Sequence, residues 1–128
     1  METNVPHAVA AYDVFRMNCP SRLVFDLIGE RWAGLVLLAL DGRPQRFSAL
    51  RRQIEGISQK MLTQTLRALE RDGLVGREAF ATVPVTVEYS LTGLGASLCQ
   101  VIEGLRTWAY VNAGNLNDAR QAYDQSHC

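Results

Sequence analysis

The stretch that decides the fold runs from Ser58 to Gly73 and reads SQKMLTQTLRALERDG. It predicts an α-helix with two opposite faces, because each residue advances about 100° around a helix axis. Three leucines, Leu62, Leu66 and Leu69, share one face and are expected to pack on a core. The opposite face carries cations and hydrogen-bond donors, namely Lys60, Thr63, Gln64, Arg67 and Arg71. Such side chains neutralise phosphates and bond to base edges in a major groove, so this segment is a candidate DNA-reading helix.

A shorter helix is predicted just before it, from Ser48 to Gln53, with its leucine facing inward and its arginines outward. Residues 55–57 form a turn between the two helices, and Ser58 is a side chain that caps helix amino ends. Gly73 stands where a residue in the left-handed conformation would end the longer helix. Two short helices joined by a glycine-containing turn make a helix-turn-helix.

Two more helices are predicted upstream. The first begins after Ser21, a potential cap, and runs toward Ile28, with Gly29 as its stop. The second spans about residues 31–40, and the apolar run within it indicates burial rather than a membrane span, which needs about 20 residues. A turn at residues 41–44 follows, because it contains Asp, Gly and Pro.

Beyond Gly73 the hydrophobic period changes from helical to alternating, which predicts a β-hairpin. Its tip is expected near residues 81–84, and its second strand ends at Thr92, which can cap a final helix. A hairpin directly after a reading helix is a wing that lies beside the adjacent minor groove. The predicted fold is therefore mainly α with a small β-hairpin wing, a winged helix-turn-helix.

A final long helix is predicted from about Leu94 to Leu116. Its apolar residues are spaced alternately four and three apart, which is typical of a seam that pairs with a second copy of the chain. Phe15 and its apolar neighbours near the amino end are expected to contribute to this homodimer interface. The alternative is that the stripe packs on its own winged domain. The seam consists of Leu94, Leu98, Val101, Leu105 and Trp108.

Length and charge fit this organisation. The chain has 128 residues, of which 48% are hydrophobic, enough for one core. We expect an amino-terminal arm (1–18), a winged domain (19–92), a dimerisation helix (93–116) and a tail (117–128). Thirteen basic and thirteen acidic residues cancel overall, yet residues 43–77 contain eight basic and three acidic ones. This segregation predicts a cationic patch around the reading helix, although a solvated arginine-rich surface is the alternative.

A series of short motifs recurs in a fixed order along the chain. These are Cys19-Pro20, IGERW (28–32), Arg46-Phe47, GISQKMLT (56–63), DGLV (72–75) and VEYSLT (87–92). In this order they closely resemble the HxlR family of bacterial, MarR-like winged helix-turn-helix regulators. The match extends from Cys19 to Trp108, and its longer motifs are highly specific.

The resemblance implies a homodimeric transcription factor that binds double-stranded DNA at inverted repeats. It implies that Gln59, Lys60, Thr63, Gln64 and Arg67 face the major groove. The family commonly has a basic residue near Thr86, where this chain is neutral, so minor-groove insertion of the wing is not predicted. Arg77 on the preceding strand is a candidate to contact phosphate instead, with a solvated wing residue as the equal alternative. The complete set of expected phosphate contacts is Arg46, Ser48, Arg51, Arg52, Arg71 and Arg77.

Cys19 is the candidate for chemistry. It precedes Pro20 and the first helix, where amide dipoles can lower a thiol pKa and favour the reactive thiolate. Several members of the resembling family sense oxidants, quinones or aldehydes at this position, which implies a sensor. A small structural residue at a dimer seam is an equally good interpretation. Cys99 is expected to pack, and Cys128 to lie in an exposed tail.

No metal site, cofactor or catalytic constellation is predicted, because three widely spaced cysteines and two remote histidines lack ligand or triad spacing. Trp32 and Trp108 are expected to be packed, with an effector pocket beside them as the alternative. Residues 2–13 lack the apolar core of a signal peptide, and a soluble, cytoplasmic chain with no membrane partner is expected.

The function predicted from the sequence is a sequence-specific DNA-binding transcriptional regulator, with repression as the default, switched by modification of Cys19. One alternative is a regulator that responds to a small reactive or aromatic effector without thiol chemistry. Another is a dimeric protein-interaction module that uses the same basic surface for an acidic partner.

Overall fold

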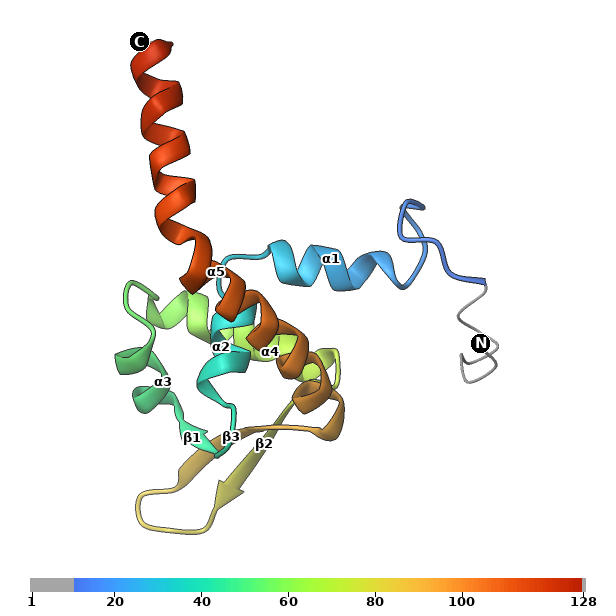
Figure 1. The fold of residues 1–128 in the computed structure, drawn as a ribbon. Helices are drawn as coiled ribbons and strands as arrows, with labels where there is room; N and C mark the ends of the chain where they lie inside the picture. Colours follow the sequence, from blue (N-terminus) through green and yellow to red (C-terminus); the bar gives the residue numbers. More distant parts are fainter. Residues whose placement is uncertain (1–10, 128) are drawn as a thin grey trace.

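Five α-helices and a small antiparallel sheet make up the computed structural model, which describes residues 11–127 (Figure 1). The mainly helical fold with a hairpin wing is as expected. In chain order the elements are α1 (Arg22–Gly29), α2 (Ala33–Ala39), β1 (Gln45–Arg46), α3 (Phe47–Gln53), α4 (Gln59–Arg71), β2 (Val75–Phe80), β3 (Thr86–Leu91) and α5 (Gly93–Ser126).

The core lies between α2 and the leucine face of α4. Val36 and Leu37 of α2 are fully buried, and so are the leucines of α4, at 0–1% exposure. Leu50 of α3 is buried beside them, while the arginines of α3 are exposed. The predicted inward and outward faces of both helices of the helix-turn-helix are therefore confirmed.

Most of the predicted helix ends are confirmed. The Ser58 hydroxyl accepts a hydrogen bond from the Met61 amide at 3.0 Å and so caps α4. Gly73 has φ +75°, the left-handed conformation that L-residues with side chains rarely adopt. Thr92 Oγ1 accepts from the Gly95 amide at 3.0 Å and caps α5.

Three local predictions were wrong. Ser21 makes no side-chain cap, because its own backbone is already helical. Helix α2 begins at Ala33 rather than Arg31, since the Glu30 carboxylate accepts hydrogen bonds from the amides of Trp32 and Ala33. Helix α3 begins at Phe47, one residue before the expected Ser48.

The sheet contains a strand that the sequence did not predict. Strand β1 has only two residues and pairs with β3 on the side opposite β2, which gives the order β1-β3-β2. Gln45 of β1 is buried, and its amide nitrogen donates to the Ala39 carbonyl at 2.8 Å. Two residues are too few for a periodic pattern, so tertiary pairing alone defines this strand.

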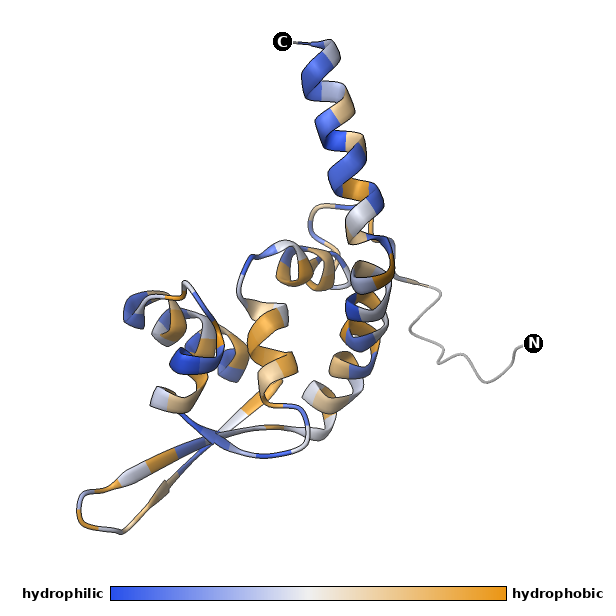
Figure 2. Cartoon of the chain, turned by 60° about the vertical axis from the view of Figure 1, so that its left-hand side comes forward, coloured by the Kyte–Doolittle hydropathy of each residue, from blue (hydrophilic) through white to orange (hydrophobic). Residues whose placement is uncertain are grey.

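Helix α5 joins the core only along its first three turns. A Cβ on Gly95 would lie 1.9 Å from the Leu74 carbonyl oxygen, so the helix crosses the end of the wing at a distance that only glycine permits. Beyond residue 116, where a tail was expected, the helix continues to Ser126 and projects away from the domain (Figure 1). This distal part is mostly hydrophilic (Figure 2). Within residues 11–127, no helix combines the length and apolar character that a bilayer crossing requires.

Candidate nucleic-acid interface

The outward face of α4 is solvent-exposed as predicted. Gln59, Lys60, Gln64 and Arg67 are exposed, and Thr63 is half-buried. The Thr63 hydroxyl donates to the Gln59 carbonyl at 2.9 Å, so within this helix its proton is already used and its oxygen remains an acceptor. Four long polar side chains therefore stand clear of the core and can reach a ligand.

The expected phosphate contacts are also exposed to solvent. These are Arg46, Ser48, Arg51, Arg52, Arg71 and Arg77. Between residues 11 and 127, ion pairs within 4.0 Å join Arg16 to Asp13 and Arg106 to Glu103, both remote from this surface. The guanidinium groups around α4 thus have no carboxylate at contact distance within the described residues, and a polyanion can neutralise them.

Arg77 lies on the side of the wing that faces α4. It lies opposite Tyr89 in the β2–β3 ladder, on the face that continues from buried Val75. Arg77 and Tyr89 line a cleft of about 420 Å³ together with Thr63, Arg67 and Glu70 of α4. Arginines from two elements therefore line one cleft, and Arg77 is not an isolated wing residue.

The other face of the wing is acidic. Glu78 lies opposite Glu88 in the ladder, and Glu88 lies opposite Arg46 of β1. Like charges directly opposite each other repel, and they also repel phosphate. The tip adds no cation, because residues 79–87 are uncharged and Val83 is fully exposed. Arg46 consequently has an acidic cross-strand neighbour, Glu88.

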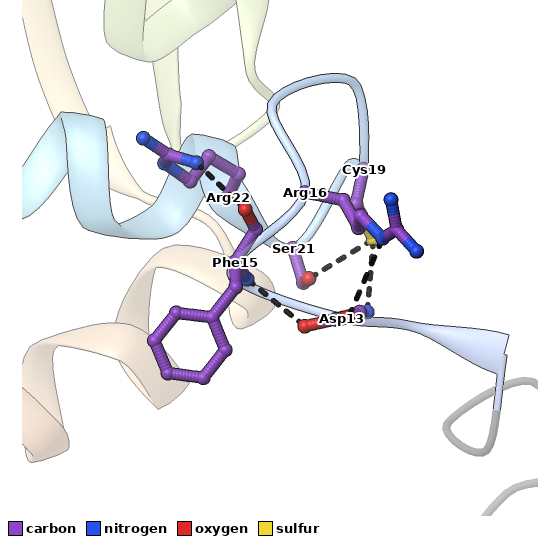
Figure 3. Close-up of polar contacts among 6 residues, drawn as sticks. All are labelled: Asp13, Phe15, Arg16, Cys19, Ser21 and Arg22. Carbon is purple, nitrogen blue, oxygen red and sulfur yellow. Dashed lines mark hydrogen bonds and ion pairs between the residues drawn. The ribbon is translucent and has the colours of Figure 1, made fainter.

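Cys19 sits in a network of hydrogen bonds at the start of α1 (Figure 3). Its sulfur accepts from the Asp13 amide at 3.2 Å and lies 3.2 Å from the Ser21 hydroxyl. Asp13 Oδ1 in turn accepts from the Phe15 amide at 3.0 Å. The thiol therefore ties the segment before it, including Phe15, to the first turn of α1.

These contacts lower the pKa of Cys19. The largest cause is the hydrogen bond with the Ser21 side chain, followed by the amides of Asp13 and Ser21, all of which stabilise the thiolate. Burial and the Asp13 carboxylate act in the opposite direction. The expected lowering is confirmed in direction, but a side-chain hydroxyl contributes more than the helix amides from which it was predicted.

Apolar side chains of α1 and α5 form an exposed surface. The seam residues Leu94, Val101, Leu105 and Trp108 are 53–64% exposed, and only Leu98 packs partly on the core. Phe15 is 87% exposed, and α1 has no buried residue at all. The alternative that this stripe packs on its own domain is therefore wrong for four of the five seam residues.

Cys99 is a packed thiol. It is 1% exposed, and its sulfur donates to the Leu37 carbonyl at 3.5 Å. Burial is the largest cause that raises its pKa, and the carboxylates of Asp41 and Glu103 add to it. The potential ligand atoms of Asp41, Cys99 and Glu103 lie within 4.8 Å of one another, close enough to share an ion. The Glu103 carboxylate, however, already binds Arg106 through both oxygens. A protonated thiol and an occupied carboxylate favour packing over metal ligation.

The two tryptophans differ from each other. Trp32 is half-buried against the core, with the Arg31 guanidinium 5.7 Å from its ring centre. Trp108 is 54% exposed, so its predicted packing is not met within this chain. Neither indole lines the cleft beside α4 or the grooves beside α1, and an effector pocket built on them is not supported.

Sequence reasoning missed two features of this surface. The acidic pair of the wing was not predicted, because a tip at residues 81–84 would pair Glu78 with Val87, whereas the observed loop at residues 81–85 shifts the register by one and pairs Glu78 with Glu88. The partnership of Arg77 with α4 depends on how the sheet packs against that helix. No local pattern signals it.

Comparisons with known proteins agree with this architecture. Residues 27–116 match the family model of the HxlR-like helix-turn-helix. The HTH-type transcriptional regulator YtfH of Escherichia coli is 46% identical over 100 residues, which cover 78% of this chain and 79% of that protein. The structure of ytfH from Salmonella typhimurium, 41% identical, superposes with a TM-score of 0.78 over 86% of this chain and 98% of its own. The structure of the redox regulator HypR in its oxidised form, 39% identical, superposes with a TM-score of 0.69 over 73% of this chain and 97% of its own. The predicted winged helix-turn-helix fold is confirmed.

Proposed function

Since this chain belongs to the HxlR-like helix-turn-helix family of transcriptional regulators, we propose that it binds double-stranded DNA as a homodimer at an inverted repeat and represses transcription by occupancy. Its relatives are named as regulators rather than enzymes. The observation that carries the proposal is the outward face of α4, where exposed cations and amides have no partner among the described residues.

Different side chains supply sequence specificity and overall affinity. Gln59, Thr63, Gln64 and Arg67 discriminate bases, at about 1–3 kcal/mol for each good contact. The arginines of α3 and the wing, together with Lys60, supply affinity that depends on salt and not on sequence. Arg77 of the wing lines one cleft with Arg67 and Glu70 of α4, which supports a phosphate contact by Arg77 close to the base contact of Arg67.

A pair of substitutions tests this division. Arg67→Ala is expected to relax preference at one base position. Arg51→Ala is expected to weaken all duplexes alike and to reduce the slope of log affinity against log salt by about one. Arg120→Ala, an exposed position on distal α5, is the matched control and should change neither. Binding isotherms on operator variants across a salt series measure both effects, and identical behaviour of the first two variants would refute the assignment.

Gel retardation separates a DNA-binding regulator from a protein-interaction module. Reduced, dimeric protein should retard duplex from the flanking chromosomal region at nanomolar concentration in moderate salt. Complete failure under these conditions would favour an acidic protein partner for the basic surface.

The exposed apolar faces of α1 and α5 support the dimer, because such large unpartnered stripes mark interaction sites. Two copies related by a twofold axis present two reading helices, which matches an inverted repeat.

We further propose that modification of Cys19 releases DNA. Its lowered pKa and the network that ties it to Phe15 support a thiol switch. HypR, a redox regulator of the same fold, supports it as well. Cys19→Ser is the deciding variant, with Cys128→Ser as its matched control. Release by oxidants or aldehydes should disappear in the first variant only, and unchanged release would favour a reversible ligand.

A further inference from the structure

A groove of about 410 Å³ lies between α1 and α4, on the side of α4 next to the reading face. Its floor consists of the buried side chains of Ala33, Thr65 and Leu69. Leu27 and Met61 are half-buried and form its walls. The floor and walls therefore offer an apolar surface of the size of a small aromatic ligand.

The rim of this groove is acidic. Asp26 of α1, Glu30 at the α1–α2 junction and Asp72 after α4 all line it, and no basic side chain does. The Glu30 carboxylate is fixed in place by the amides of Trp32 and Ala33. Asp72 also follows the carboxyl end of α4, where the helix dipole is negative. Every charge that faces the groove therefore has the same sign.

A second groove lies on the α5 side of α1 and has fewer charged lining residues than the first. That groove, of about 440 Å³, shares Leu23, Leu27 and Asp72 with the first groove, and apart from Ser97 its other lining residues are apolar. It suits the uncharged side chains of a second copy. The first groove adds the carboxylates of Asp26 and Glu30 to that of Asp72. Covering all three with such side chains would remove them from water, and the amides that bond to Glu30 compensate only that one, so it is costly. The acidic groove therefore calls for an occupant that brings positive charge.

We propose that the groove between α1 and α4 binds lipophilic cations, such as quaternary ammonium or phosphonium ions that carry aryl groups. The aryl groups cover the floor, and the cation lies among the carboxylates of Asp26, Glu30 and Asp72. Gln64 and Ala68 of α4 form the edge that the groove shares with the reading helix. A bound cation therefore contacts α1 and α4 together and alters how α4 meets DNA, a consequence that rests on the proposed function.

Tetraphenylphosphonium and tetraphenylborate make a matched pair of probes, since they have the same shape and opposite charge. Equilibrium dialysis of the full chain should show binding of the phosphonium at least about tenfold tighter than of the borate, weakened by added salt. Asp26→Asn and Asp72→Asn should each weaken phosphonium binding by about threefold. Asp118→Asn, an exposed carboxylate on distal α5, is the control and should leave it unchanged.

A substitution that fills the groove distinguishes binding inside it from non-specific attraction of the cation to an acidic surface. Ala68 is exposed on α4 and lines the groove, so Ala68→Leu occupies the space and leaves every carboxylate in place. It should weaken phosphonium binding at least about tenfold. Absence of binding, equal binding of the two probes, or unchanged binding to Ala68→Leu would overturn the proposal.

A second measurement keeps this proposal distinct from DNA binding. Tetraphenylphosphonium should change the affinity of the unmodified chain for its DNA and not that of Ala68→Leu. If the chain retards no DNA, the proposed function fails while dialysis still reports on the groove. If the chain binds DNA and dialysis fails, only the cation site is refuted.

Discussion

Helices α4 and α1 are both amphipathic, but they use their apolar faces differently. The leucines of α4 are completely buried inside the winged domain, whereas Leu23, Val24 and Phe25 of α1 are 43–64% exposed. The same kind of sequence pattern thus yields a core helix in one place and an open surface in the other. The difference indicates that α4 is stabilised within one chain, while the apolar side chains of α1 and of the outer side of α5 stay exposed to solvent in the single chain.

The largest expected effect is the loss of stability when a buried leucine of α4 is truncated. Leu66→Ala should lower the free energy of unfolding by about 2–5 kcal/mol, because it leaves a cavity in a fully packed core. Leu23→Ala should cost less than about 1 kcal/mol in dilute solution, since that side chain is mostly exposed. Urea unfolding at low protein concentration measures both. Equal losses would mean that α1 is as firmly packed as α4.

The crossing of α5 over the wing gives the next effect. Gly95→Ala should destabilise the fold by about 1–3 kcal/mol or more, because its Cβ would overlap the Leu74 carbonyl. Gly104→Ala is the matched control on the same helix, with open space around it, and should stabilise by about 0.5–1 kcal/mol. Thermal unfolding compares them, and a stable Gly95→Ala variant would contradict the close approach.

The open surface can be tested without disturbing the core. Val101→Asp should raise the dissociation constant of the homodimer at least about tenfold, because it buries a charge in an apolar interface. Gln100→Asp is exposed on a neighbouring side of the same helix and should have a smaller effect. Sedimentation over a range of concentrations decides, and an unchanged dimer would show that α5 does not form the seam.

The smallest effect concerns the two thiols. Below the usual thiol pKa, Cys19 should react with iodoacetamide faster than Cys99, because the pKa of the first is lowered and that of the second is raised. Ser21→Ala should move the midpoint of the Cys19 rate profile to higher pH, since the largest lowering contact is lost. A Cys128→Ser background removes the tail thiol. A midpoint that does not move would assign the lowering to the backbone amides.

The features of the site that depend on neighbouring residues in the sequence could be predicted. The faces of α4, the cap at Ser58 and the left-handed Gly73 depend on a few neighbouring residues, so periodicity and capping rules were sufficient. The predicted cap at Ser21 was wrong because the Ser21 backbone is already helical, and its hydroxyl lies beside the Cys19 sulfur instead. The predicted end of the last helix, at about Leu116, was wrong because the polar part of α5 that extends to Ser126 has no hydrophobic stripe to mark it.

The sequence alone determined the winged fold class and the cationic outward face of α4, because each follows from residue types repeated at the spacing of one element. Only the tertiary structure decided that Arg77 joins Arg67 beside α4, that Glu78 and Glu88 make the other wing face acidic, and that carboxylates from three segments meet over one groove. These arrangements depend on strand register and on how helices pack, which bring together residues that no local pattern connects.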